Sequence, residues 1–182
     1  YIIPMEEPVK RFVENLPYPL TGAQKKVLNE IRQDFSDTMA MNRLLQGDVG
    51  SGKTIVAMTA MYAAVLAGYQ AALMAPTEVL AEQHYQNFVK LLSPLGITVA
   101  LLTGSTKAKE KREIKAACAS GEIQILIGTH AVIQDDVAFD NLAFIVTDEQ
   151  HRFGVKQRDA FMKKGKDPHV LVMSATPIPR TL

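Results

Sequence analysis

Residues 47–54 have the types and spacing of a loop that binds phosphate groups. The pattern G-x-x-x-x-G-K-[ST] is met by Gly47-Asp48-Val49-Gly50-Ser51-Gly52-Lys53-Thr54, between an apolar run and a helical pattern. Glycines let backbone N–H groups turn inward around an anion, and the start of the following helix attracts negative charge. We expect the Lys53 ammonium to reach the β- and γ-phosphates of a nucleotide and the Thr54 hydroxyl to bind Mg²⁺.

Two acids follow a later apolar run, Ala143–Thr147. We expect Asp148 to hold Mg²⁺ through its water shell, because Mg²⁺ keeps several waters, and Glu149 to orient and deprotonate an attacking water. Alone, such a pair is usually a helix cap or a solvated turn, and the phosphate-loop pattern upstream favours catalysis. A lone histidine usually makes a structural hydrogen bond, but for His151 we favour coupling of the γ-phosphate site to the next motif.

The elements that must position these residues alternate regularly along the chain. Short apolar runs predict strands at Arg43–Gln46, Ala71–Ala75, Thr98–Leu102, Ile123–Ile127, Leu142–Thr147 and Val170–Met173. Helices are predicted between them at Lys53–Ala67, Thr77–Leu92, Lys107–Ala119, near His130 and at Val155–Lys164. Uniformly apolar strands separated by helices are typical of a parallel sheet covered on both faces, with ligands at the carboxyl ends of the strands. We predict an α/β three-layer sandwich with a mainly parallel central sheet flanked by helices.

The amino-terminal part differs in composition from the rest. Residues 1–20 are rich in proline and predict a linker with one short helix around Glu7–Asn15, and Thr21 caps the helix that follows. We therefore place a nucleotide-binding domain at 21–182. The chain starts at Tyr1 without an initiator Met and ends at Leu182 without a tail, so we expect a piece of a longer protein.

Composition excludes some classes and is silent on others. The chain has 182 residues, enough for one domain, and no apolar run approaches the roughly 18 residues of a membrane span. Twenty Lys and Arg against nineteen Asp and Glu give a net charge of +1, which by itself does not indicate nucleic acid. Cys118 is the one cysteine, so no internal disulfide can form, and we expect a soluble, cytoplasmic protein without a membrane partner.

Longer strings within the chain resemble one family. GDVGSGKT, APTEVLAEQH from Ala75, DEQHRFGV from Asp148 and MSATPIPRTL from Met173 are together similar to the RecG family of bacterial superfamily-2 DNA helicases, over essentially the whole chain. The resemblance implies the first RecA-like P-loop motor domain of an ATP-dependent helicase that remodels replication forks and Holliday junctions in recombination and repair. A second RecA-like domain and a junction-binding domain would lie outside this chain, which alone would be nearly inactive.

Other readings remain beside this one. The transcription-repair coupling factor has a similar motor but usually has Glu where this chain has Gln150 and an aromatic residue where it has Ser51; the primosomal helicase is more distant. A regulatory ATP-binding module without turnover is disfavoured by the intact Asp148 and Glu149. A small-molecule kinase would need a lid and an acceptor pocket, which the sequence does not show.

The resemblance also implies roles for particular residues. Gln24 would read adenine with its amide and Tyr18 would stack on the ring, although both could be ordinary helix and linker residues. Coupling would involve Gln150, His151, Ser174, Ala175 and Thr176. DNA phosphates would lie against Pro76, Thr77, Thr103, Gly104, Ser105, Thr129 and His130, of which Thr77 also caps a helix. The basic stretch 152–166 is either a solvated face or a further DNA contact.

Overall fold

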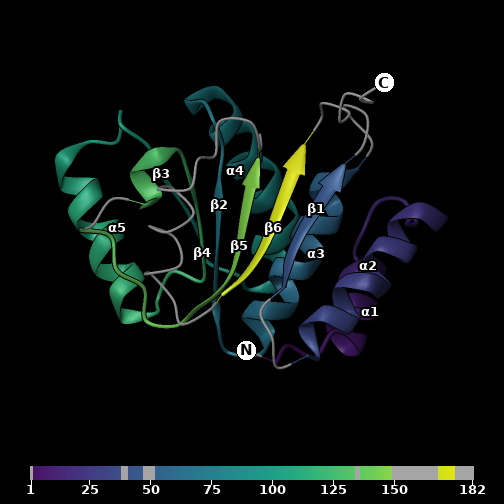
Figure 1. The fold of residues 1–182 in the computed structure, drawn as a ribbon. Coiled ribbons are helices and arrows are strands. Elements are labelled where there is room, and N and C mark those ends of the chain that lie inside the picture. Colours follow the sequence, from purple (N-terminus) through teal and green to yellow (C-terminus); the bar gives the residue numbers. More distant parts are fainter. Residues whose placement is uncertain (1, 38–40, 47–51, 134–135, 149–167, 175–182) are drawn as a thin grey trace, which may run out of the picture.

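Six parallel strands form one sheet in the described part of the chain (Figure 1). The computed structural model describes residues 2–37, 41–46, 52–133, 136–148 and 168–174. The strands are β1 (Asn42–Gln46), β2 (Gln70–Met74), β3 (Val99–Leu102), β4 (Ile125–Gly128), β5 (Leu142–Asp148) and β6 (His169–Ser174). They are arranged in the order β1-β6-β5-β2-β4-β3. The predicted central sheet is confirmed, and each pair of neighbouring strands in it is parallel.

Helices cover both faces of this sheet, which makes three layers. They are α1 (Glu6–Glu14), α2 (Gly22–Phe35), α3 (Lys53–Leu66), α4 (Glu78–Leu92) and α5 (Ala108–Ser120), with short 3₁₀ turns η1 (Ser93–Leu95) and η2 (His130–Ile133). Alternate residues of each strand point to opposite faces, so Leu73 belongs to the apolar cluster that includes α3 and α4, and Ala72 to the cluster that includes α5 and η2. No helix in the described ranges has both the length and the apolar character to cross a bilayer.

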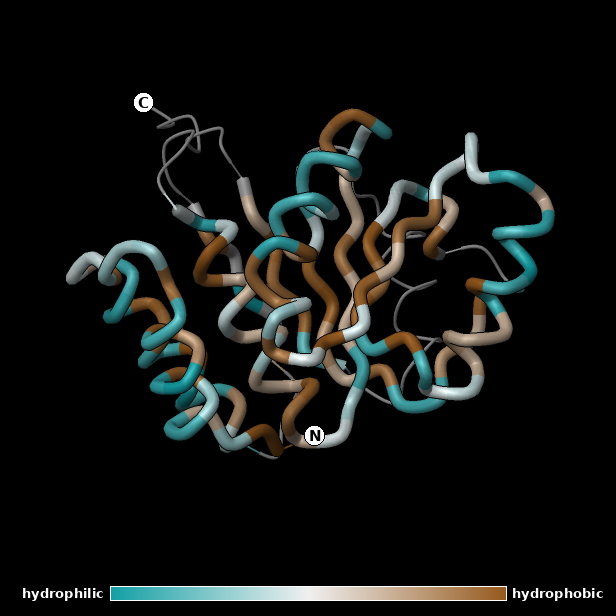
Figure 2. Tube along the Cα trace, turned by 180° about the vertical axis from the view of Figure 1, so that it is seen from behind, coloured by the Kyte–Doolittle hydropathy of each residue, from teal (hydrophilic) through white to brown (hydrophobic). Residues whose placement is uncertain are grey.

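The central part of helix α3 is buried on all sides, in keeping with its almost uniformly apolar sequence. Every residue of 55–65 is buried, because the sheet covers one side of the helix and α1 and α2 pack on the other. The ring of Phe12 in α1 lies 5.7 Å from that of Tyr62 in α3, measured between centroids. Figure 2 shows hydrophobic residues gathered on the strands and on the helix faces turned toward them. The segment predicted as a linker with a short helix therefore packs onto α3 and contributes Ile3 and Met5 to the same core.

The helices that lead away from the sheet edge begin at residues suited to that position. Thr21 and Gln24 form a capping box at α2, and the Thr77 hydroxyl accepts a hydrogen bond from the Leu80 N–H at 3.2 Å at α4. Gly52 precedes α3 with a φ of 82°, a left-handed conformation that favours glycine. The predicted helix bounds agree with the structure to within about two residues, a normal uncertainty for helix ends. The predicted helix Val155–Lys164 lies outside the described residues.

Candidate nucleotide and nucleic-acid sites

The carboxyl ends of β1, β6 and β5 lie side by side at one edge of the sheet (Figure 1). Leu45 of β1 is opposite Met173 of β6, and Met173 is opposite Asp148 of β5. Because neighbouring strands are about 4.8 Å apart, Asp148 lies about 10 Å from the end of β1, which precedes the predicted phosphate loop in sequence. The sheet therefore brings together the three strands whose ends carry the predicted phosphate loop, the acidic pair and the Ser-Ala-Thr motif.

Much of these motifs lies outside the described residues. This applies to Gly47, Asp48, Val49, Gly50 and Ser51 of the loop, to Glu149, Gln150 and His151, to Ala175, Thr176 and the Ser174 side chain, and to the basic stretch 152–166. The roles assigned to them remain predictions from the sequence.

Gly52, the described end of the predicted phosphate loop, is contacted by a side chain from α2. Gln24 Nε2 donates a hydrogen bond to the Gly52 carbonyl oxygen at 3.3 Å, and Gln24 Oε1 accepts one from the Thr21 N–H at 2.8 Å. A Cβ atom on Gly52 would lie 2.1 Å from Gln24 Nε2 and would displace this side chain, and the φ of 82° at Gly52 also favours glycine. Lys53 and Thr54 follow in the first turn of α3, both half-buried, where backbone N–H groups point out of the helix end.

A pocket of about 320 Å³ lies beside this helix start. It is lined by Tyr18, by Gly52, Thr54, Ile55 and Met58 at the start of α3, and by Asn87, Lys90 and Leu91 of α4. Tyr18 is 50% exposed, which leaves its ring accessible to a ligand. The sequence prediction included Tyr18 but missed Asn87 and Lys90. Their signal is weak, because polar residues on a helix usually face solvent.

Asp148 makes a contact that the sequence prediction also missed. His84 Nε2 in α4 lies 2.9 Å from Asp148 Oδ2, and His84 is only 8% exposed. The two residues are 64 positions apart, so no local pattern relates them. His84 was part of the string APTEVLAEQH and received no role of its own.

The chemistry of the two predicted ligands fits Mg²⁺. The Thr54 hydroxyl and the Asp148 carboxylate offer the hard oxygen donors that Mg²⁺ prefers, and the Asp148 side chain is 24% exposed and so reachable from solvent. The described residues hold no cluster of three His, Cys, Asp or Glu that could enclose a metal. Mg²⁺ bound with a nucleotide does not need one, since it commonly uses one or two protein ligands, substrate phosphates and waters.

The candidate DNA residues follow the other three strands, β2, β4 and β3, which are also neighbours. Pro76 and Thr77 follow β2, Thr129 and His130 follow β4, and residues 103–105 follow β3. These loops therefore form one row, which we call the DNA half of the edge. It lies beside the ends of β1, β6 and β5, which we call the nucleotide half. Thr77, Gly104, Ser105 and His130 are exposed, whereas Thr103 is buried.

Glu78 connects two of these loops. Its carboxylate accepts hydrogen bonds from the Ser105 N–H at 3.1 Å and from the Ser105 hydroxyl at 2.7 Å. The first residue of α4 thus fixes the loop after β3. The same two donors are of the kind that bind phosphate oxygens, so an incoming phosphate would compete with this carboxylate.

Comparison with known proteins places this arrangement in a family. A model of the DEAD/DEAH box helicases matches residues 21–182. The chain belongs to that family.

Individual relatives agree with this assignment. The chain is 59% identical to ATP-dependent DNA helicase RecG of Bacillus subtilis over 97% of its length and 57% identical to that of Synechocystis over 98%. It spans only 26% and 22% of the length of these relatives. A structure of RecG bound to a three-way DNA junction is 49% identical, with a TM-score of 0.86 over 98% of the chain and 24% of that protein. The helicase MrfA, at 18% identity and a TM-score of 0.73, shares the fold. The predicted fold class and family resemblance are confirmed.

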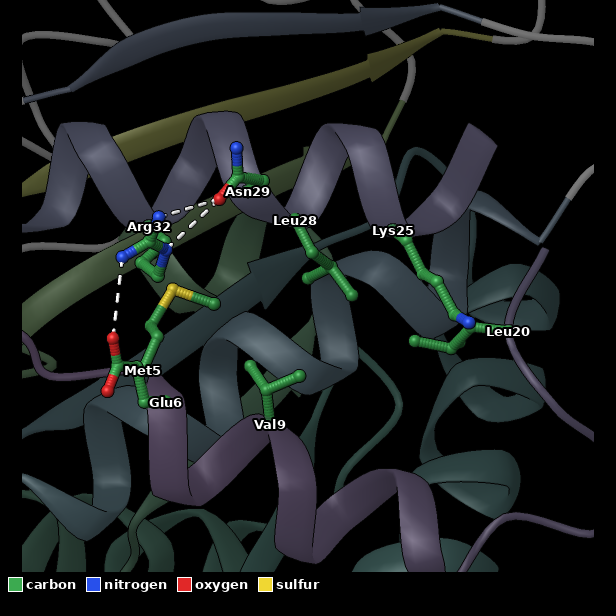
Figure 3. A pocket seen from close by; sticks show the side chains of 8 residues that line it. All are labelled: Met5, Glu6, Val9, Leu20, Lys25, Leu28, Asn29 and Arg32. Atoms are coloured by element: carbon green, nitrogen blue, oxygen red, sulfur yellow. Dashed lines mark hydrogen bonds and ion pairs between the residues drawn. The ribbon is translucent and has the colours of Figure 1, made fainter. Parts of the chain in front are cut away.

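Two further features lie apart from the sheet edge. A pocket of about 280 Å³ between α1 and α2 is lined by four apolar and four polar side chains, among them the ion pair of Arg32 with Glu6 (Figure 3). Cys118 is buried in α5, and burial raises the pKa of its thiol to about 12. The thiol therefore stays protonated near neutral pH and is not a nucleophile.

Proposed function

We propose that this chain is the ATP-binding first motor domain of a RecG-type DNA helicase that remodels branched DNA in recombination and repair. The proposal rests mainly on the order of the strands, which divides one edge of the sheet into two halves. The predicted nucleotide motifs follow β1, β6 and β5, and the predicted DNA-binding residues follow β2, β4 and β3. The high identity to RecG proteins supports the same function, and the RecG structure with a three-way junction supports branched DNA as the substrate.

The nucleotide half would bind ATP through residues 47–54. Lys53 would place a positive charge on the β- and γ-phosphates, and the backbone N–H groups at the start of α3 would supply further donors. Tyr18 would cover the base in the 320 Å³ pocket, and Gln24, which contacts the lining residue Gly52, would lie near it. Mg²⁺, held by Thr54 and Asp148, would neutralise part of the phosphate charge. Glu149 would take the proton of the attacking water.

The other half would contact DNA without reading its sequence. Hydroxyl and N–H donors of Thr77, Ser105 and Thr129 suit backbone phosphates. Gln150, His151 and the motif Ser174-Ala175-Thr176 would couple the two halves. A second RecA-like domain of the same polypeptide would provide the second grip that unwinding requires. We further infer a cytoplasmic parent protein, because a chromosomal DNA substrate is found there.

The test uses the full-length parent protein and its phosphate release with and without branched DNA. We expect DNA to raise the rate, Lys53→Ala to abolish ATP binding, and Glu149→Gln to keep ATP affinity while lowering turnover by roughly 10²–10⁴-fold. Hydrolysis that ignores DNA would contradict the motor and favour a kinase. ATP binding without turnover in the wild type would indicate a regulatory module. Stimulation by linear duplex equal to that by junctions would favour a translocase of the transcription-repair coupling type.

A further inference from the structure

His84 of α4 is in contact with the carboxylate predicted to hold the metal. We propose that His84 is a positioning residue that fixes Asp148 for Mg²⁺, an inference that rests on the proposed function. The His84 Nε2 to Asp148 Oδ2 distance of 2.9 Å is that of a good hydrogen bond. The imidazole engages Oδ2, and the carboxylate keeps further lone pairs that could accept from a metal-bound water.

The imidazole can act in this way because its own position is fixed. Helix α4 packs on β3 and β4, and Ala81, Phe88 and Leu92 are fully buried along the same helix. The start of the helix is held by the Thr77 cap and by the two Glu78–Ser105 hydrogen bonds. A side chain that is 8% exposed on so constrained a helix has few alternative rotamers, so its hydrogen bond selects one carboxylate orientation.

The location of the pair gives it further meaning. Asp148 ends β5 and His84 lies on the helix that follows β2, and β5 and β2 are the two strands where the nucleotide half and the DNA half of the edge meet. About two helical turns separate His84 from Glu78, which contacts the loop after β3. The His84–Asp148 hydrogen bond therefore links the carboxylate predicted to bind Mg²⁺ to the helix that begins in the DNA half of the edge.

A purely structural role is the alternative, because a buried His–Asp pair also stabilises a fold. The two roles differ in what they change. Loss of a structural contact lowers the melting temperature and weakens nucleotide binding with or without metal. Loss of a contact that orients a metal ligand acts on metal affinity, typically by about 10–100-fold.

The experiment compares His84→Gln with His84→Asn in the full-length protein. A glutamine amide nitrogen can reach the position of Nε2 and donate to Asp148, whereas the shorter asparagine reaches only the position of Nδ1. Binding of a fluorescent, non-hydrolysable ATP analogue is titrated with Mg²⁺ and repeated in EDTA. Gln86→Ala, at an exposed position of the same helix, is the matched control.

We expect His84→Asn to raise the half-saturating Mg²⁺ concentration by about 10–100-fold while leaving the affinity in EDTA unchanged. His84→Gln should stay within about threefold of wild type, the cost of ordering a more flexible side chain. In an Asp148→Asn background, His84→Asn should add no further loss. The positioning role is overturned if both variants show the same Mg²⁺ dependence as wild type. It is also overturned if His84→Asn loses as much affinity for the analogue in EDTA as it does with Mg²⁺. Failure of the wild type to bind the analogue at all contradicts the proposed function instead.

Discussion

Gln24 shows how one side chain can serve two elements at once. Its carbonyl oxygen completes the capping box of α2, and its amide nitrogen holds the Gly52 carbonyl at the end of the phosphate loop. Both hydrogen-bonding groups of the amide are thus in use before any ligand binds. If Gln24 also reads adenine, as the sequence predicts, the base must share these groups. Binding of the base would then alter the hydrogen bond from Gln24 to Gly52 at the end of the loop.

Tyr18 offers a cleaner test of the base pocket, because half of its surface is exposed and it belongs to no described core cluster. We expect Tyr18→Ala to weaken ATP binding by about 5–150-fold, since stacking on a base contributes about 1–3 kcal/mol. Thermal melting without nucleotide should be unchanged. The measurement is equilibrium binding of ATP, with Leu66→Ala, an exposed position at the end of α3, as the control. Unaltered ATP affinity in Tyr18→Ala would place the base elsewhere.

The positions of the loops after β3 and β4 depend on how closely these two strands approach each other. Glycine at the end of β4 allows one such approach, because a Cβ on Gly128 would lie 1.9 Å from the Leu102 carbonyl oxygen of β3 and 2.7 Å from Val132 Cγ2 of η2. The loops after β3 and β4, which hold the candidate DNA residues 103–105 and 129–130, are therefore set by the fit at this position.

We predict that Gly128→Ala forces β3 and β4 apart and costs about 1–3 kcal/mol of stability. For a domain of this size, that corresponds to a fall in melting temperature of about 2–12 °C. DNA affinity of the parent protein should fall as well, while ATP binding without DNA is retained. The comparison is with Gly22→Ala, because a Cβ at Gly22 meets nothing within 4 Å. Equal melting temperatures for the two variants would show that the strands adjust without strain.

The proposed function makes this chain one of two motor domains in a longer protein. The chain spans about a quarter of the length of its RecG relatives. From the sequence we predict that this chain supplies a phosphate loop, the Mg²⁺-binding carboxylate of Asp148 and the general base Glu149. In motors of this kind an arginine from the second domain completes the site, and such a residue accelerates hydrolysis by about 10³–10⁵-fold.

The isolated chain should therefore bind ATP with Mg²⁺ and hydrolyse it very slowly, and it should not unwind DNA. The measurement is steady-state phosphate release by residues 1–182, with and without branched DNA, beside strand separation of a labelled fork. The full-length protein provides the positive control. Turnover of about 1 s⁻¹ or more, or a strong rise with DNA, would show that one domain is sufficient.

The sequence predicted the elements better than their arrangement. The strands and most helices were placed to within about two residues, because uniformly apolar runs such as Leu142–Thr147 have few alternatives to a buried strand. The order of the strands was not predicted, since a local pattern contains no information on which strands become neighbours. The same limit applies to His84 with Asp148 and to Gln24 with Gly52, which meet only after the sheet forms. The packing of α1 on α3 was not predicted, because the prolines of residues 1–20 suggested a linker. The apolar outer side of α3 is buried only when another helix packs against it.

The order of the strands has a consequence for synthesis on the ribosome. In the described sheet β1 has β6 as its hydrogen-bonded neighbour, and β6 is the last of the six strands to be translated. A nascent chain can pair β2, β3, β4 and β5 early, but β1 has no edge to join until residues 169–174 have emerged. The strand β1, which precedes the predicted phosphate loop, therefore joins the sheet only after β6 has been translated. If residues 47–54 bind ATP as proposed, a growing polypeptide would complete its sheet and become able to bind ATP at the same late stage.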